Sequence, residues 1–157
     1  MTPLLRARGF TLVELVIVMT VIGILAVTLG PRFFTQSVFS QRGYADELAS
    51  ALRFAQKAAV SSQCPTRLIL TATTYVAVQQ AAAGNSCDSS DNSWSMPVLG
   101  ADGAAIQGSA PANTTVSPIG TYQFDDQGRL IGNSGTTLTI GARTITIVPG
   151  TGFVQVQ

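Results

Sequence analysis

One acidic residue, Glu14, lies inside an apolar run, GFTLVELVIVMTVIGILAVTLG, that extends from Gly9 to Gly30. A charged side chain at the centre of a membrane helix costs roughly 2.5–3.5 kcal/mol, so a carboxylate within such a run needs a cationic partner. Cleavage between Gly9 and Phe10 would create one, because the new α-amino group would lie four residues before the acid. That amine could pair with Glu14 of its own helix or of a neighbouring helix. The second arrangement would make the acid an assembly device.

The two cysteines, Cys64 and Cys87, could form a disulfide if the part of the chain that carries them matures in an oxidising compartment. A bridge over a loop of about two dozen residues would stabilise the fold by about 3–4 kcal/mol in the chain-entropy model. It would tie the polar segment 81–94 to the end of the preceding helix. We expect neither a metal nor a redox role, since the chain has no histidine, no CxxC motif and no second cysteine pair.

The other polar residues do not predict catalysis, and we expect no enzyme activity and no cofactor. Without histidine, Ser-His-Asp and Cys-His chemistry is excluded. Asp125 and Asp126 are adjacent, and neighbours in a strand point to opposite faces, so they make a poor acid–base pair. The motif FDDQGRL instead predicts a strand that enters a turn, with Gly128 supplying the special backbone angle.

The segment 81–94, AAAGNSCDSSDNSW, predicts a polar loop. Its side-chain oxygens could bind calcium, but they lack the ordered spacing of an EF-hand. A solvated loop is therefore the favoured interpretation. Trp94 at its end is either a core side chain or part of a contact surface. The candidate oxygen ligands are Asn85, Ser86, Asp88, Ser89, Ser90 and Asp91.

Residues 10–30 are the element that must position Glu14. These 21 residues carry one charge, and a helix of this length spans about 30 Å, the thickness of the hydrocarbon core. Arg6 and Arg8 precede the run without any acid, which predicts a cytoplasmic N-terminus and an exported body. A cleaved secretory signal would be shorter and would end at a small-residue site that ILAVTLGP lacks. A plain signal anchor fits the length but leaves Glu14 unexplained.

The rest of the chain predicts one more helix and a β-rich part. Pro31 predicts a kink or local unwinding after Gly30. An amphipathic helix should then run to about Ser61 and pack its apolar stripe on a sheet. Short runs rich in Thr, Val and Ile, bounded by turn residues, predict strands beyond Cys64. The stripe consists of Tyr44, Leu48, Leu52, Ala55 and Ala59, and the predicted strands are TRLILTA, TYVAVQQ, TYQFDD, RLIGN, TTLTIG, RTITIVP and GFVQVQ.

The sequence R-A-R-G-F-T-L-V-E-L resembles the class III signal of type IV prepilins and type II secretion pseudopilins. The resemblance implies cleavage after Gly9 by a prepilin peptidase, N-methylation of Phe10 by the same peptidase/methyltransferase, and a docking role for Glu14. It further implies an α+β, pilin-like fold, in which a long N-terminal helix, membrane-spanning in its first half, packs on an antiparallel β-rich head.

The predicted organisation follows from this resemblance. Residues 1–9 are a leader, 10–30 a transmembrane and assembly helix, 31–63 its amphipathic continuation, and 64–157 the head. The implied partners are other pilin or pseudopilin subunits, the inner membrane and its assembly platform. The head would be periplasmic before assembly, and the subunit would then enter a pilus or a periplasmic pseudopilus.

Two further patterns narrow the function. The ending FDDQGRL with TITIVPGTGFVQV is similar to GspH/FimT-like minor pseudopilins, whereas PRFF with the cysteine pair is similar to minor pilins of mannose-sensitive haemagglutinin (MSHA) systems. We therefore predict a minor subunit of an MSHA-like type IV pilus. The alternatives are a GspH-like pseudopilin of a type II secretion system and a membrane-tethered binding module that uses the 81–94 loop.

The charge balance does not identify a partner. The chain has nine basic and eight acidic residues, and removal of Arg6 and Arg8 with the leader leaves seven basic residues and a net charge of −1. Near-neutrality makes nonspecific nucleic-acid binding unlikely, although a local basic patch is compatible with it.

Overall fold

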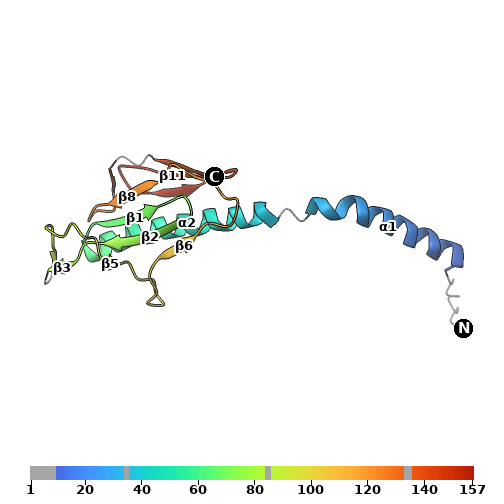
Figure 1. Ribbon diagram of the computed structural model, residues 1–157, viewed down its shortest axis with the longest axis horizontal. Helices are drawn as coiled ribbons and strands as arrows, with labels where there is room; N and C mark the ends of the chain where they lie inside the picture. Colours follow the sequence, from blue (N-terminus) through green and yellow to red (C-terminus); the bar gives the residue numbers. More distant parts are fainter. Residues whose placement is uncertain (1–9, 34–35, 84–85, 133–135) are drawn as a thin grey trace, which may run out of the picture. The chain divides into compact units, whose positions relative to one another are not determined.

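The chain divides into two units, residues 1–36 and 37–157. Helix α1 (Leu12–Phe33) lies in the first unit. The structure is a computed structural model that describes residues 10–33, 36–83, 86–132 and 136–157 (Figure 1). The predicted unwinding at Gly30–Pro31 is wrong, because α1 continues through both residues. Proline fits helical φ but removes one backbone hydrogen bond, and α1 ends two residues after Pro31, at Phe33.

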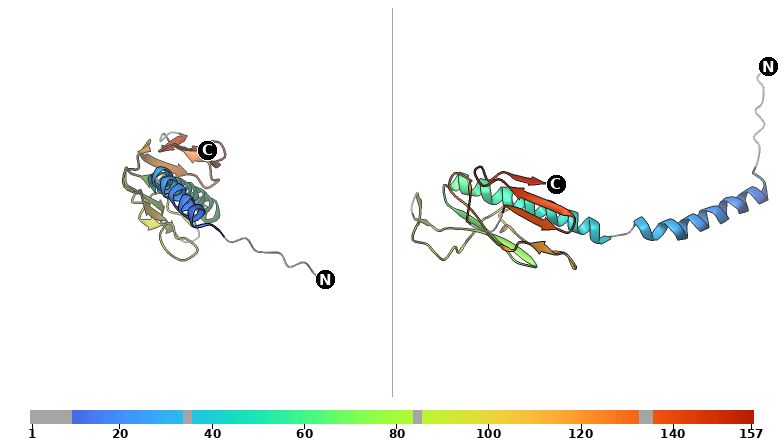
Figure 2. Two further views of the ribbon diagram at one scale, coloured as in Figure 1. Left: turned by 90° about the vertical axis from the view of Figure 1, so that its right-hand side faces the viewer. Right: turned by 90° about the horizontal axis from the view of Figure 1, so that it is seen from above.

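Helix α2 (Gln36–Ser62) is the amphipathic helix predicted over 31–63. Its predicted apolar stripe is confirmed: Tyr44 is 2% exposed, and Leu48, Leu52, Ala55 and Ala59 are fully buried. The stripe forms one core cluster with side chains from the strands, so α2 belongs to the same unit as the β-rich part. The end-on view shows strands of both large sheets close to α2 (Figure 2).

Two antiparallel sheets cover α2 through this shared core. The larger sheet has the order β5-β2-β1-β8-β9, with β6 also paired to β2, and the smaller has the order β12-β11-β10-β7. The strands of the larger sheet are β1 (Thr66–Leu70), β2 (Thr74–Gln79), β5 (Met96–Pro97), β6 (Gln107–Ser109), β8 (Gly120–Phe124) and β9 (Leu130–Ile131). Those of the smaller are β7 (Val116–Ser117), β10 (Thr137–Ile140), β11 (Arg143–Ile147) and β12 (Val154–Val156).

The longer strands alternate buried and exposed positions, as a sheet with one covered face requires. In β1, Leu68 and Leu70 are buried while Ile69 is 37% exposed, and in β10 Leu138 and Ile140 are fully buried. β1 and β2, which correspond to the predicted strands TRLILTA and TYVAVQQ, pair antiparallel with Leu68 opposite Ala77.

Five short strands were not predicted from the sequence, and β6, with three residues, is the longest of them. The 81–94 segment contains a two-residue hairpin of β3 (Ala82–Ala83) and β4 (Ser86–Cys87), and β5 and β7 likewise have two residues each. A run this short shows no alternation, so its pairing is set by the neighbouring strand rather than by its own sequence. The α+β, pilin-like fold class is confirmed.

Candidate processing, assembly and disulfide sites

The start of α1 is built around Thr11 and Glu14. Thr11 precedes the helix, and its Oγ1 accepts a hydrogen bond from the backbone N–H of Glu14 at 3.3 Å. The backbone N–H of Leu15 donates to the Thr11 carbonyl at 3.2 Å. Thr11 is therefore an N-cap, and T-L-V-E has the spacing of a capping box. This cap was not predicted from the sequence, although the T-L-V-E spacing indicates it.

The Glu14 carboxylate lies in the first turn of α1, where the helix dipole favours negative charge. Glu14 and Phe10 are both exposed, Phe10 at 80%. Gly9, the predicted cleavage position, lies outside the described residues. Both side chains are therefore open to contacts from outside, and the cleavage, methylation and docking roles stay predictions.

Apolar side chains surround α1 on every side. All side chains described from Phe10 to Ala26 are exposed, including Leu12 at 81% and Met19 at 67%. Large exposed apolar surfaces mark contacts with another protein or a membrane. Searched over the described residues, no helix meets the length and hydropathy required to cross a membrane. The single-pass topology therefore stays a prediction.

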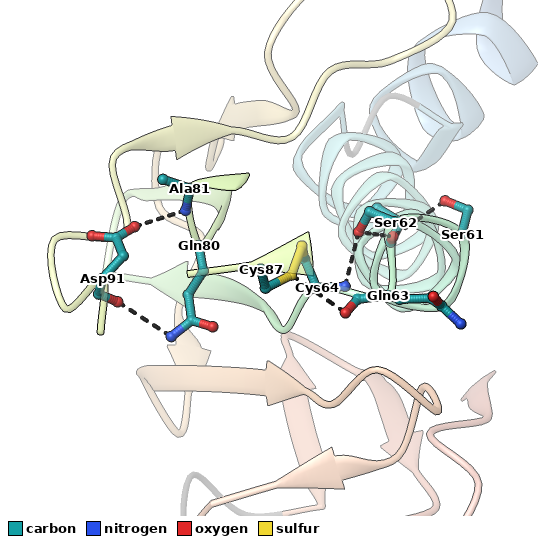
Figure 3. The surroundings of a disulfide bond; sticks show 9 residues. Ser61, Ser62, Gln63, Cys64, Gln80, Ala81, Cys87 and Asp91 are labelled. Carbon is teal, nitrogen blue, oxygen red and sulfur yellow. Dashed lines mark hydrogen bonds between the residues drawn. A yellow bond between two sulfur atoms is a disulfide. The ribbon is translucent and has the colours of Figure 1, made fainter. Parts of the chain in front are cut away.

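The predicted disulfide joins Cys64 to Cys87, with Cα atoms 5.3 Å apart. Cys64 follows the end of α2, where Gln63 adopts a positive φ of 53° and the Cys64 N–H donates to the Ser62 hydroxyl at 3.2 Å. Cys87 closes the β3–β4 hairpin. The bridge thus ties the 81–94 segment to the end of α2, as predicted (Figure 3).

The carboxylates of the 81–94 segment organise the loop itself. Asp91 accepts a hydrogen bond from the N–H group of Ala81 at 2.7 Å, and Gln80 donates to its carbonyl (Figure 3). The N–H group of Ser93 also donates to the Asp91 carboxylate, at 2.8 Å. The pKa of Asp91 is lowered, most strongly by a hydrogen bond from the Ser93 side chain and less strongly by the bonds from the N–H groups of Ala81 and Ser93. Asp88 accepts from the Ser90 N–H at 2.9 Å. Within the described parts of the chain, no cluster of three His, Cys, Asp or Glu residues could hold a metal.

Trp94 is buried rather than exposed. It is 8% exposed with a φ of 51°, and the Arg67 guanidinium lies 3.6 Å from its ring centroid. Arg67 is itself held by a hydrogen bond from its Nε to the Gln123 side chain at 2.9 Å. The core interpretation of Trp94 is confirmed, and its use as an exposed contact residue is wrong. The sequence could not show that an arginine of β1 covers the ring.

Asp125 forms the predicted turn. Its Oδ1 accepts from the N–H groups of Gln127 at 3.0 Å and Arg129 at 2.7 Å, and its Oδ2 accepts from Arg129 Nε at 2.8 Å. Gly128 has a positive φ of 78°, the angle that a turn glycine supplies. Burial acts to raise the pKa of Asp125, but the hydrogen bonds and charge of Arg129 outweigh it and lower the pKa. The carboxylate is thus a turn residue.

Two family models match the chain. The prokaryotic N-terminal methylation motif matches residues 4–30, and the type II transport protein GspH matches residues 44–152, which is more than half of the 157 residues. The first match includes the start of α1, and the second includes the core of the β-rich unit. Neither the curated proteins nor the solved structures contain a significant match.

Proposed function

This chain belongs to the type II transport protein GspH family and carries the N-terminal methylation motif, and we propose that it is a minor subunit of an MSHA-like type IV pilus. It is a pilin- or pseudopilin-type structural subunit. Such membership implies processing by a prepilin peptidase, anchoring in the inner membrane and assembly with other pilin subunits. In the finer proposal, cleavage follows Gly9, Phe10 is methylated, and the subunit enters the pilus through α1.

The observation that carries the proposal is the exposed apolar surface of α1. Leu15, Val18 and Ile22 are each about half exposed or more, so this apolar surface is open to lipid or to another helix. Lipid can cover it before assembly, and neighbouring helices can cover it in a filament. Exchange of one apolar environment for the other lets the subunit leave the membrane at a modest cost in hydrophobic free energy.

Glu14 supplies the register in this proposal. Helix–helix contacts between apolar surfaces are weakly specific along the axis, because one row of side chains resembles the next. A single carboxylate that pairs with the α-amino group of Phe10 in a neighbouring subunit would select one axial position. A charge-assisted hydrogen bond away from bulk water is strong enough to do so.

The test replaces Glu14 and compares the variant with a cap variant. We expect Glu14→Ala to be inserted and processed normally but to be depleted at least tenfold from sheared surface filaments, measured by immunoblot. Thr11→Ala removes the hydrogen bond to the Glu14 N–H and keeps the carboxylate, so it should be incorporated nearly as well as wild type. Equal depletion of both variants would show that Glu14 acts only in the helix cap.

A pseudopilin of a type II secretion system is the second candidate, and the description of the family that matches residues 44–152 favours it. The two functions differ in where the mature subunit goes. In the pilus, the tagged chain is recovered with sheared surface fibres, and its recovery depends on the pilus assembly platform. In the pseudopilus, it stays in the periplasm, and its loss stops secretion. A chain that stays with the membrane in both cases would be a tethered binding module.

A further inference from the structure

A cleft of about 280 Å³ lies between the start of α2 and the turn that connects β10 to β11. Its apolar wall is formed by Val38, Ile140 and Ala142, and its polar wall by Gln41, Arg42 and Arg143. Ile140 is fully buried and belongs to the core, whereas Val38 and Ala142 are exposed and accessible to a ligand. The cleft lies wholly within the β-rich unit and is separate from the disulfide and the 81–94 loop.

Two arginines give the cleft its charge. Arg42 is exposed and forms no ion pair with any residue that the structure describes. Arg143 Nη2 lies 3.8 Å from Asp46 Oδ1, which is too long for a hydrogen bond, and the Asp46 side chain is 61% exposed. This exposed pair contributes little to stability, so two positive charges face one weakly engaged carboxylate. The cleft therefore has a net positive charge.

Arg143 also has an unused donor. Its Nε is buried and makes no hydrogen bond with the described residues. A buried donor without a partner costs free energy, which a ligand can recover if a small side-chain movement exposes the donor to it. The planar guanidinium fork suits two oxygens of one phosphate or carboxylate, which it binds in bidentate fashion.

We propose that this cleft binds the phosphate of an anionic phospholipid headgroup at the membrane surface. The apolar wall favours a lipid over a protein carboxylate, because the phosphate of a phospholipid is attached to hydrocarbon that can lie against Val38 and Ala142. Val38 at 40% and Phe39 at 68% exposure extend this apolar surface along the start of α2. The inference rests on the membrane anchoring in the proposed function.

The chain connectivity supports this ligand. Eight residues separate Gly30, the end of the predicted membrane segment, from Val38 at the cleft. Because a chain covers at most about 3.6 Å per residue, the cleft is tethered within roughly 29 Å of that segment's end. Basic residues close to a membrane gain about 1 kcal/mol each from anionic lipids. The contact would hold the base of the head at the membrane until the subunit enters the filament.

The test measures lipid retention by the mature full-length chain in a neutral detergent. Phosphatidylglycerol or phosphatidylcholine is added, and bound lipids are counted by native mass spectrometry. We expect wild type to retain phosphatidylglycerol several-fold more than phosphatidylcholine. Arg42→Gln and Arg143→Gln should each weaken this retention about fivefold. Lys57→Gln, which removes one charge from the same helix outside the cleft, should not change it.

Several results would overturn the proposal. Equal losses in Lys57→Gln and the arginine variants would indicate general charge attraction. Full competition by millimolar inorganic phosphate would indicate a free-anion site. Unchanged lipid retention in the arginine variants, combined with their depletion from sheared filaments, would assign the cleft to a carboxylate of another subunit. Arg42 is exposed, so its variant keeps the test valid if Arg143→Gln fails to fold, which circular dichroism would reveal.

The lipid proposal and the pilus proposal can be refuted independently of each other. Selective lipid retention in a protein that is absent from sheared fibres would leave the cleft assigned and remove the filament function. Normal filament incorporation without selective retention would do the reverse.

Discussion

The two helices of this protein place their apolar side chains in opposite ways. In α1, every side chain described between Phe10 and Ala26 is exposed, although nearly all of them are apolar. In α2, the apolar side chains from Tyr44 to Ala59 form a stripe that is buried in the core, whereas Val38, Phe39 and Val60 near the helix ends are exposed. A helix buries an apolar surface against whatever partner is available. The partner of α2 is its own β-rich unit, whereas the apolar side chains described in α1 are exposed and open to another partner.

The polar contacts of α2 show the same difference. Arg53 Nη2 donates to the Val154 carbonyl at 3.0 Å, and Gln56 Nε2 donates to the carbonyls of Gly128 at 3.1 Å and Thr151 at 2.7 Å. The fully buried Thr66 donates to the Ala55 carbonyl at 2.8 Å. These bonds fix the register between α2 and the strands. In α1, the described hydrogen bonds are local, as in the bond from Thr20 to the Ile17 carbonyl.

The strongest test of this difference between the helices makes the same leucine-to-alanine substitution in each of them. Leu52→Ala should lower the free energy of unfolding of the β-rich unit by about 2–5 kcal/mol, because Leu52 is fully buried and its loss leaves a cavity. Leu15→Ala should leave that free energy unchanged within about 0.5 kcal/mol, since Leu15 is 51% exposed. Chemical denaturation of the mature chain in a neutral detergent measures both values.

The matched control also separates folding from assembly. Leu15→Ala should lower incorporation into filaments while the head stays folded. A loss of head stability in this variant would show that α1 contributes to the core of the β-rich unit, and the contrast between the helices would then be lost.

The elements with strong periodicity could be predicted from the sequence. The stripe from Tyr44 to Ala59 was visible because one side of a helix faces a continuous core. The strands β1, β2, β10 and β11 were visible because they alternate and are bounded by turn residues. The candidate site around Glu14 could be predicted because a lone carboxylate conflicts with its apolar surroundings.

Features that depend on a distant partner could not be predicted. The burial of Trp94 requires Arg67, which lies 27 positions earlier, and nothing in either local sequence indicates their contact. The strands β5 and β7 exist only through pairing with β2 and β10. The cleft at Arg42 and Arg143 forms where α2 meets a hairpin about 100 residues later in the chain. The sequence gives the two positive charges but not that they lie at one cleft.

Removal of the disulfide tests how much of the stability of the head comes from a covalent bond. Cys64 and Cys87 are separated by 23 positions, and loss of the bridge should cost about 3 kcal/mol in the chain-entropy model. We expect Cys64→Ala with Cys87→Ala to lower the melting temperature by circular dichroism and to speed proteolysis of the 81–94 segment. A variant with an unchanged melting temperature would show that hydrogen bonds to Asp91 hold this segment without the bridge.

The turn at Asp125 offers the smallest and most selective test, because it changes with pH. The folded-state pKa of this carboxyl is lowered, so the ionised form stabilises the head above the ordinary value of about 4, and this contribution is lost as pH falls below it. Asp125→Asn keeps an oxygen for the turn but removes the charge that pairs with Arg129. We expect the variant to be about 0.2–1 kcal/mol less stable at pH 7, since the Arg129 side chain is 52% exposed.

The difference between wild type and Asp125→Asn should shrink as the pH is lowered from about 4 toward 2, where the wild-type carboxyl is protonated as well. Denaturation curves recorded across this range measure the change. Asp126→Asn is the matched control, because Asp126 is adjacent and exposed. If both variants gave the same pH profile, the effect would come from net charge rather than from the bond between Asp125 and Arg129, and the turn would owe its stability to the backbone alone.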